Sequence, residues 1–163
     1  MASQGQNLNL INTGILPKDA CIVIVHTQWN PDVVSRLLDG CVSVLKENGF
    51  NNYKIFQVPG CFELAFGIKS IWQNFSQRFE KPQCFIALGC VMRGETPHFD
   101  FISKAVTDGI LALNLQLPVP TVFGVLTVNN QKQADDRLGG PQGHKGREAA
   151  LTALKMLEFK YKL

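Results

Sequence analysis

The sequence predicts an α/β protein built in three layers, with a four-stranded parallel sheet covered by helices on both faces. Apolar runs with strand character alternate four times with stretches of helical periodicity, as parallel strands joined by crossover helices require. The run at residues 84–91 is apolar except for one glycine, which indicates a strand buried on both faces. The 163 residues, 45% of them hydrophobic, suit one globular domain. We place this domain at residues 19–163, behind an N-terminal arm at residues 1–18.

The first strand is predicted at residues 21–25, CIVIV, and a helix follows it. Asn30-Pro31 opens this helix, because proline is favoured at the first helical position. Asn48-Gly49 closes it with residues that tolerate the left-handed conformation. YKIFQV at residues 53–58 reads as the second strand, which ends at Pro59-Gly60. The apolar positions of the helix recur at helical spacing: Val34, Leu37, Leu38, Cys41 and Leu45.

A second helix is predicted to begin near Phe62, and a third after the strand at residues 84–91. Thr96 suits the N-cap of the third helix and Pro97 its first position, so that free N–H groups and the positive end of the dipole face the solvent. The apolar stripe of the second helix contains Leu64, Ala65, Ile68, Trp72 and Phe75. The apolar face of the third contains Phe101, Ile102, Ala105, Gly109, Ile110 and Leu113.

Pro118 and Pro120 end the third helix and leave residues 121–128, TVFGVLTV, as the fourth strand. A helical turn at residues 130–137 then leads into a glycine-rich loop at residues 138–146. The last helix carries Ala149, Ala150, Ala153, Leu154, Leu157 and Tyr161 on its apolar face.

Composition and charge exclude several classes of function. The net charge of +3 is small and its lysines and arginines are dispersed, so no nucleic-acid partner is expected. The N-terminus has neither a basic flank nor a long apolar core, which predicts no membrane segment and a cytoplasmic protein. Five cysteines, an odd number, sit mostly in apolar runs and are expected to be reduced. Cys84, Cys90 and His98 lack a CxxC pair and a fourth ligand, so no metal is expected.

Ligands of such sheets bind beyond the carboxyl ends of the strands, where the unusual polar and aromatic residues of this chain lie. His98 is the best candidate for a general base, because the dipole at a helix start favours the neutral imidazole; a surface cap is the alternative. Arg93 can bind phosphate or pair with Glu95 or Asp100. The loops concerned are residues 27–30, 59–63, 91–98 and 128–145.

Three further features each allow two interpretations. Trp29, at a loop tip, either packs locally or stacks on a planar ligand. Glu63 either stabilises a helix dipole or binds a hydroxyl-rich ligand. Arg137 is either a solvated charge or a ligand for an anion. The glycine-rich loop lacks the Gly-Lys-Ser/Thr ending of a phosphate loop, which makes a nucleotide triphosphatase a poor match.

Taken together, the motifs of this chain resemble those of the lumazine synthase family, from about residue 20 to the C-terminus. The order and spacing of the motifs carry the resemblance, since each is too short to be specific alone. They are QWN (28–30), VPGCFEL (58–64), ALGCVMRGETPHFDFI (87–102), FGVLT (123–127), QADDRLGG (133–140) and HKGREAA (144–150).

The resemblance implies a flavodoxin-like fold and a transferase of riboflavin biosynthesis that needs no cofactor or metal. It implies condensation of 5-amino-6-ribitylaminouracil with 3,4-dihydroxy-2-butanone 4-phosphate to 6,7-dimethyl-8-ribityllumazine, with release of phosphate and water. It also implies a homo-oligomer, either a pentamer or an icosahedral shell of pentamers, with riboflavin synthase as a candidate partner. Seven residues separate Arg137 from Lys145, a compact connection without the insertion that obstructs shell packing in some pentameric members of the family. By this resemblance the chain is slightly favoured to permit the larger assembly.

The same resemblance assigns roles to residues at matching positions. Trp29 matches the aromatic residue that stacks on the pyrimidine, and His98 the residue that transfers protons. The ribityl chain would lie on Cys61, Phe62 and Glu63, and the ring against the backbone of Cys90, Val91 and Met92. Glu95 and Thr96 match the phosphate-binding turn, with Arg93 a further candidate. The residues that a neighbouring subunit would contribute are Phe123, Arg137 and, as a further candidate, Lys145.

Three positions depart from the family pattern, and two other functions compete. His144 replaces a usual Asn, Met92 a branched aliphatic residue and Cys61 a Ser or Ala. An archaeal-type riboflavin synthase has a related fold, but the Gly-Glu-Thr-x-His turn argues against it. The other alternative is a non-catalytic scaffold that binds flavin or forms a shell.

Overall fold

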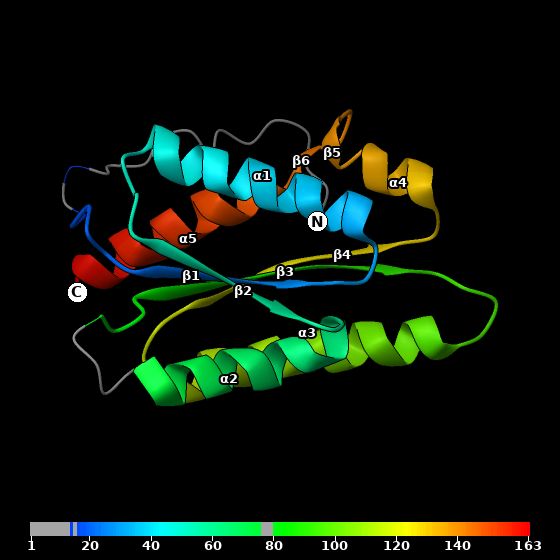
Figure 1. Ribbon diagram of the computed structural model, residues 1–163, viewed down its shortest axis with the longest axis horizontal. Coiled ribbons are helices and arrows are strands. Elements are labelled where there is room, and N and C mark those ends of the chain that lie inside the picture. Colours follow the sequence, from blue (N-terminus) through cyan, green and yellow to red (C-terminus); the bar gives the residue numbers. More distant parts are fainter. Residues whose placement is uncertain (1–13, 15, 76–79) are drawn as a thin grey trace.

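The structure is a computed structural model that describes residues 14, 16–75 and 80–163. Most of the predicted N-terminal arm, residues 1–18, lies outside the described residues. Four parallel strands form one sheet in the order β2-β1-β3-β4, with β4 at an edge. Figure 1 shows the strands as a central layer between two layers of helices. The strands are β1 (Ile22–Thr27), β2 (Tyr53–Val58), β3 (Cys84–Met92) and β4 (Thr121–Val128).

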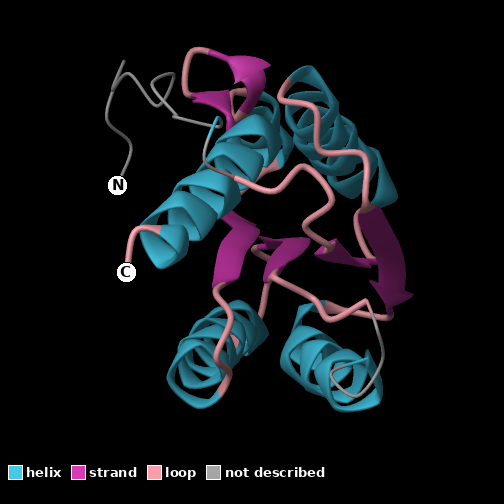
Figure 2. Ribbon diagram, turned by 90° about the vertical axis from the view of Figure 1, so that its left-hand side faces the viewer, coloured by secondary structure: helices cyan, strands magenta, loops and turns pink. Residues whose placement is uncertain are grey.

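Two long helices cover each face of the sheet, and Figure 2 shows the three layers in cross-section. One face carries α1 (Pro31–Glu47) and α5 (Lys145–Tyr161), and the other carries α2 (Leu64–Phe75) and α3 (His98–Gln116). This arrangement confirms the predicted α/β fold, a flavodoxin-like sandwich. The short elements are η2 (Cys61–Glu63), α4 (Gln131–Asp135), β5 (Leu138–Gly140) and β6 (Gly143–His144).

The alternation of side chains along the strands divides the core into two clusters. Along β3, Ile86 and Leu88 pack in the cluster beneath α1 and α5, whereas Phe85 and Ala87 pack beneath α2 and α3. Successive side chains of a strand point to opposite faces, so a sheet covered on both sides needs an apolar residue at every position. This explains why the sequence of β3 is apolar throughout.

The ends of the helices confirm one prediction and correct another. Pro31 is the first residue of α1, and Gly49 follows its end with a φ of 80°. Thr96, however, is not the N-cap of α3. Pro97 takes that position, because its carbonyl oxygen accepts the N–H of Asp100 at 3.0 Å. No side chain caps this helix, which begins at His98.

Two aromatic residues predicted on apolar helix faces are exposed instead. Phe101 is 70% exposed, because it lies nine residues, or about half a turn in projection, from the buried Ile110. Tyr161 keeps the spacing of the α5 stripe but is 45% exposed. It belongs to the last turn of α5, where every residue after Glu158 is exposed.

The glycine-rich segment at residues 138–146 is not the open loop that its composition predicts. Its two short strands, β5 and β6, pair as an antiparallel hairpin. Gly139 and Gly143 have positive φ values of 108° and 78°, which few other residues tolerate. After the hairpin, α5 starts directly against α1. A Cβ on Gly146 would clash with the carbonyl oxygen of Leu37, so glycine is required for this approach.

All five cysteines are buried and carry free thiols. Among the described residues, no helix is long and apolar enough to cross a membrane.

Candidate active site

A cavity of about 600 Å³ lies beyond the carboxyl ends of β1 and β3, where the sequence predicts the site. We call it the aromatic cavity. The loops after β1 and β2 and the start of α3 form its walls. Its lining residues are Trp29, Asn30, Pro59, Gly60, Cys61, Phe62, Glu63, Cys90, Val91, Met92, His98 and Ile102.

Trp29 stands at the mouth of the aromatic cavity with 72% of its surface exposed. Its backbone is held in place, since its N–H donates to the Pro59 carbonyl at 3.3 Å. Local packing does not account for this residue, because its indole ring remains largely in solvent. A fixed backbone and an exposed ring suit stacking on a planar ligand.

Asn30 is a lining residue that the sequence prediction did not include. It is the only described residue other than glycine with a positive φ, 56°, and its side-chain amide donates to the Cys90 carbonyl at 2.9 Å. The bond fixes the loop that carries Trp29 to β3. Asn tolerates the left-handed conformation better than most residues, so its place between Trp29 and Pro31 was an available signal.

Cys61 and Cys90 line the cavity without being suited to nucleophilic chemistry. Burial raises the pKa of the Cys61 thiol to about 12 and that of Cys90 to about 11, so both stay protonated near neutral pH. Gly89 makes room for Cys61, because a Cβ there would lie 2.7 Å from its sulfur. The Cys90 side chain packs beneath α1 and α5, on the other side of the sheet from the Cys61 cluster.

An aromatic ring, a carboxylate and two apolar side chains also line the cavity. Phe62, in the short helix η2, is 63% exposed, and Glu63 follows it with its N–H donating to the Gly60 carbonyl. Val91 and Met92 end β3 and form the floor with an apolar surface. Apolar walls with a few polar groups are typical of small-molecule sites.

His98 is exposed at the first position of α3 and faces the aromatic cavity. No hydrogen bond of its ring to another described residue is present, so the imidazole is open to a ligand. Arg93, by contrast, is engaged: its guanidinium pairs with Asp100 at 2.9 Å and lies 4.1 Å from the centre of the Phe99 ring. Its partner is therefore Asp100 and not Glu95.

Glu95 and Thr96 lie in the exposed turn between β3 and α3. They are close in sequence to His98, but neither lines a described cavity. Nothing in the structure assigns them a ligand.

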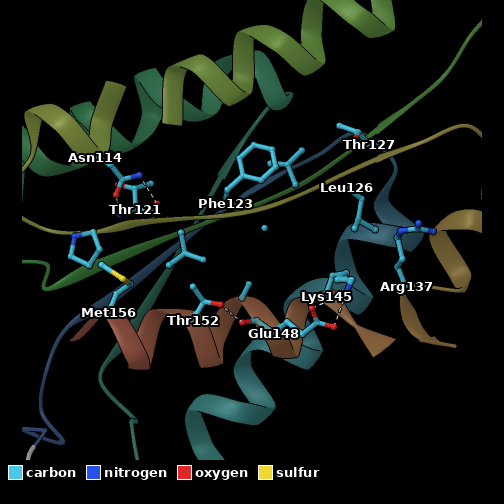
Figure 3. Close-up of a pocket in the computed structure, with 15 residues that line it drawn as sticks. Asn114, Thr121, Phe123, Leu126, Thr127, Arg137, Lys145, Glu148, Thr152 and Met156 are labelled. Carbon is cyan, nitrogen blue, oxygen red and sulfur yellow. Dashed lines mark hydrogen bonds and ion pairs between the residues drawn. The ribbon is translucent and has the colours of Figure 1, made fainter. Parts of the chain in front are cut away.

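A second hollow, of about 700 Å³, runs along edge strand β4 and the facing side of α5 (Figure 3). We call it the basic groove. Figure 3 shows Arg137 and Lys145 near one end and Asn114, Thr121 and Met156 near the other. Its lining residues are Asn114, Pro120, Thr121, Val122, Phe123, Gly124, Val125, Leu126, Thr127, Arg137, Lys145, Glu148, Ala149, Thr152 and Met156.

The two cations of the groove are held differently. Arg137 donates to the Gln133 carbonyl at 2.9 Å, and no carboxylate among the described residues pairs with it. Lys145 is paired with both oxygens of Glu148, at 2.7 and 2.8 Å. Phe123 projects from β4 and is 41% exposed. Arg137 thus keeps donors free for an anion.

The predicted site residues therefore divide between two hollows, except for Arg93, Glu95 and Thr96, which line neither. The aromatic cavity brings together Trp29, Cys61, Phe62, Glu63, Cys90, Val91, Met92 and His98. Phe123, Arg137 and Lys145 line the basic groove, which shares no lining residue with the cavity. In the described residues, no three His, Cys, Asp or Glu side chains gather into a group able to hold a metal ion.

A parallel sheet covered on both faces, with a ligand-sized cavity beyond the ends of its strands, defines a flavodoxin-like α/β protein of the small-molecule-binding class. Comparison with known proteins narrows this class. The family described as 6,7-dimethyl-8-ribityllumazine synthase matches residues 19–161.

Curated relatives agree with the family match. The 6,7-dimethyl-8-ribityllumazine synthase of Parabacteroides distasonis is 40% identical over 98% of this chain and 99% of its own length. That of Cytophaga hutchinsonii is 44% identical over 96% of this chain and 98% of its own. That of Phocaeicola vulgatus is 44% identical over 86% and 82%. The chain belongs to the 6,7-dimethyl-8-ribityllumazine synthase family, a family of enzymes, and the resemblance found in its sequence is confirmed.

Proposed function

We propose that this chain is a 6,7-dimethyl-8-ribityllumazine synthase of riboflavin biosynthesis. The transferase condenses 5-amino-6-ribitylaminouracil with 3,4-dihydroxy-2-butanone 4-phosphate and releases phosphate and water. One observation carries this proposal beyond the family match: an exposed tryptophan and an unpaired histidine face the same ligand-sized cavity. Stacking and proton transfer are what a planar amine substrate requires.

The aromatic cavity would bind the pyrimidine substrate. Its ring stacks on Trp29 and lies along the backbone of Cys90, Val91 and Met92. The ribityl chain runs over the η2 segment, where Glu63 can accept hydrogen bonds from its hydroxyl groups. The Cys90 carbonyl already accepts the Asn30 amide, so this contact fixes the wall rather than the ligand.

His98 would move the protons of the condensation. The amine of the pyrimidine loses a proton as its nitrogen adds to the ketone carbon, and the carbonyl oxygen gains protons before it leaves as water. An imidazole at hydrogen-bonding distance can accept the first proton and return it. Holding both substrates in one cavity contributes further acceleration.

Elimination of phosphate requires groups that stabilise negative charge, and the aromatic cavity provides few of them. The turn with Glu95 and Thr96 leads into the start of α3, whose N–H groups favour an anion. Arg93 is engaged with Asp100 and contributes less. Arg137 has a guanidinium without a carboxylate partner among the described residues, which suits a phosphate, but it lies in the basic groove. We therefore place Arg137, with Lys145 as a further candidate, at the phosphate end of a neighbouring subunit's site. Phe123 of the same groove would contact the pyrimidine or ribityl part of the substrate there.

Such a shared site requires a homo-oligomer. Head-to-tail contacts generate a ring where the rotation between subunits closes, and the resemblance to the family makes the pentamer the ring that we propose. The connection between Arg137 and Lys145 is a compact hairpin, which is compatible with packing of pentamers into an icosahedral shell and with riboflavin synthase as its partner. The five buried free thiols support a reducing, cytoplasmic location.

An assay with both substrates tests the function. Release of inorganic phosphate together with the absorbance of the lumazine product is the expected result. An archaeal-type riboflavin synthase would instead consume the lumazine and form riboflavin. A scaffold would bind the ligand without turnover. Either outcome, obtained with folded protein, would contradict the proposal.

A further inference from the structure

His144 stands at the junction of the β5–β6 hairpin and α5. It is the N-cap of α5, and its ring atom Nδ1 accepts the backbone N–H of Arg147 at 3.4 Å. The next residue, Lys145, donates its own backbone N–H to the Arg137 carbonyl at 2.9 Å. This hydrogen bond links the backbones of Arg137 and Lys145, the two cations of the basic groove, directly beside the position where His144 caps α5.

The imidazole ring is wedged against α1. A Cβ on Gly40 would lie 2.7 Å from Nδ1 and closer still to Cε1, so only glycine leaves space for the ring. Two other contacts hold the same junction. Arg36 donates to the Leu138 carbonyl at 3.1 Å, and Gly146 rests against Leu37. The hairpin thus sits on α1, with His144 between them.

The surroundings of the ring disfavour its protonation on balance. Arg36 faces it from α1, and Arg147 and Glu148 from α5, while β5 contributes Leu138 and Gly139, which carry no charge. Burial is the largest effect and lowers the pKa of the His144 ring, and the charges of Arg147 and Arg36 lower it further. A hydrogen bond to its own backbone and the charge of Glu148 act in the opposite direction, but the pKa stays below its ordinary value. Glu148 is itself occupied by Lys145.

We propose that His144 is a positioning residue: its neutral ring holds the hairpin that carries Arg137 and Lys145, and protonation of the ring releases that hold. Its link to substrate rests on the proposed function, in which these cations meet a neighbouring subunit's phosphate. A proton on Nδ1 would turn the acceptor into a donor that faces the Arg147 N–H. It would also place a positive charge at the positive end of the α5 dipole.

The direction of the pH dependence follows from the neutral form. Because folding lowers the pKa of His144, its stabilising contact is fully present above the ordinary histidine pKa of about 6.5. The contact is lost as the pH falls through the lower value of the folded protein. Acid should therefore loosen the hairpin before it unfolds the domain.

The test compares wild type with His144→Asn and His144→Ala, each as the assembled full chain, between about pH 8 and about pH 5.5. Asparagine keeps a cap acceptor and cannot titrate, whereas alanine removes the cap. Hydrogen exchange of peptides from residues 138–148 is the readout. Near neutral pH, His144→Ala should exchange about tenfold faster than wild type. On acidification, wild type should approach His144→Ala, while His144→Asn stays protected.

Comparison at the same pH cancels the intrinsic exchange rate. Gly40→Ala supplies a second test, because its methyl group displaces the ring: exchange should accelerate in wild type and much less in His144→Asn. The proposal is overturned if the ratio of exchange rates between wild type and His144→Asn stays constant over the whole pH range. It is also overturned if His144→Ala exchanges at the wild-type rate near neutral pH.

The KM for the butanone phosphate connects the hairpin to the substrate. On acidification, the ratio of the wild-type KM to the KM of His144→Asn should rise several-fold. His98 is present in both proteins, so its contribution to the pH dependence cancels from this ratio. An unchanged KM ratio would overturn the link to phosphate. If exchange changes as expected but no protein forms lumazine, the hold on the hairpin stands and the proposed function fails. If lumazine forms but the exchange ratios do not change with pH, the proposed function stands and the proposed role of His144 fails.

Discussion

The aromatic cavity and the basic groove are similar in volume but opposite in chemistry. The cavity, at the ends of β1 and β3, is lined by aromatic rings, backbone and His98, and it contains no lysine or arginine among its lining residues. The groove, along β4 and α5, contains Arg137 and Lys145 and a single exposed aromatic ring, Phe123. One hollow can stack a ring and move a proton, and the other can bind an anion.

The difference is what the proposed shared site requires: each subunit would carry two halves of different sites. Condensation with loss of phosphate needs proton transfer and charge stabilisation at the same substrates. Neither hollow provides both. A head-to-tail contact, which brings one surface of a subunit against a different surface of the next, can join a cavity to a neighbour's groove.

The largest effect is expected from His98→Ala, which removes the proton carrier of the cavity. Turnover should fall roughly 100-fold, while binding of the ribitylaminouracil is retained because Trp29 and η2 are intact. Steady-state kinetics and calorimetric binding measure the two quantities. A variant with an unchanged rate would remove His98 from the mechanism.

A large loss of stability is expected on the groove side from Gly146→Ala. The added methyl group would clash with the Leu37 backbone where α5 meets α1, and such overpacking costs about 1–3 kcal/mol. Gly94→Ala is the matched control beside the cavity, since no atom lies within 4 Å of its added Cβ. Denaturant unfolding at equal protein concentration should separate the two. Equal midpoints would show that the α5 junction is not tightly packed.

Trp29→Ala should weaken binding of the pyrimidine substrate up to about tenfold, the value of one aromatic stacking contact. Its 72% exposure means that folding should be almost unaffected. Trp29→Phe keeps a stacking surface and should bind nearly as well as wild type. If instead the alanine variant unfolds, and its folded fraction binds normally, the ring has a structural role.

The smallest effect is expected from Glu47→Gln, which removes the ion pair between Glu47 on α1 and Arg147 on α5. Hydrogen bonds from Arg147 and Ser43 lower the pKa of Glu47 to about 2. The contribution of Glu47 to the free energy of unfolding is therefore present above the pKa of the unfolded chain, near 4.5. It is lost as the pH falls toward 2. Both partners are exposed, so the contribution is small. Unfolding midpoints measured against pH should show a weaker acid dependence in Glu47→Gln; an identical dependence would contradict this.

Local chemistry made much of the fold predictable. Proline at the start of α1 and glycine after its end depend on neighbouring residues alone. The apolar sequence of β3 was readable because burial on both faces of the sheet demands an apolar residue at every position. Phe101 was misplaced because the buried side of α3 is set by its packing on the sheet. The hairpin was missed because strands of three and two residues leave almost no pattern.

Most of the polar and aromatic residues that line the two hollows were named from the sequence, but their arrangement was not predictable. Motif order identified Trp29, His98 and Arg137, and the resemblance to the family assigned them to different subunits. Sequence patterns alone contain no information on which residues share a hollow, because this depends on the crossing of β4 and α5. Asn30 was overlooked as a site residue: its tolerance of the left-handed conformation was a signal in the sequence, but its bond to the Cys90 carbonyl arises only in the folded chain.

Co-assembly of His98→Ala with Arg137→Ala tests the shared site most directly. Each variant alone damages every site. In a mixed ring, an interface that joins an intact His98 to a neighbour's intact Arg137 is a complete wild-type site. Random mixing of equal amounts should restore about a quarter of the interfaces, given two independent choices at each head-to-tail contact.

Mass spectrometry of the mixed oligomers must first demonstrate that subunits have exchanged. A shared site then predicts lumazine formation at roughly one quarter of the wild-type rate, well above the rate of either parent. Activity that stays at the parental level in demonstrably mixed rings would contradict it, because His98 and Arg137 would then act within one chain.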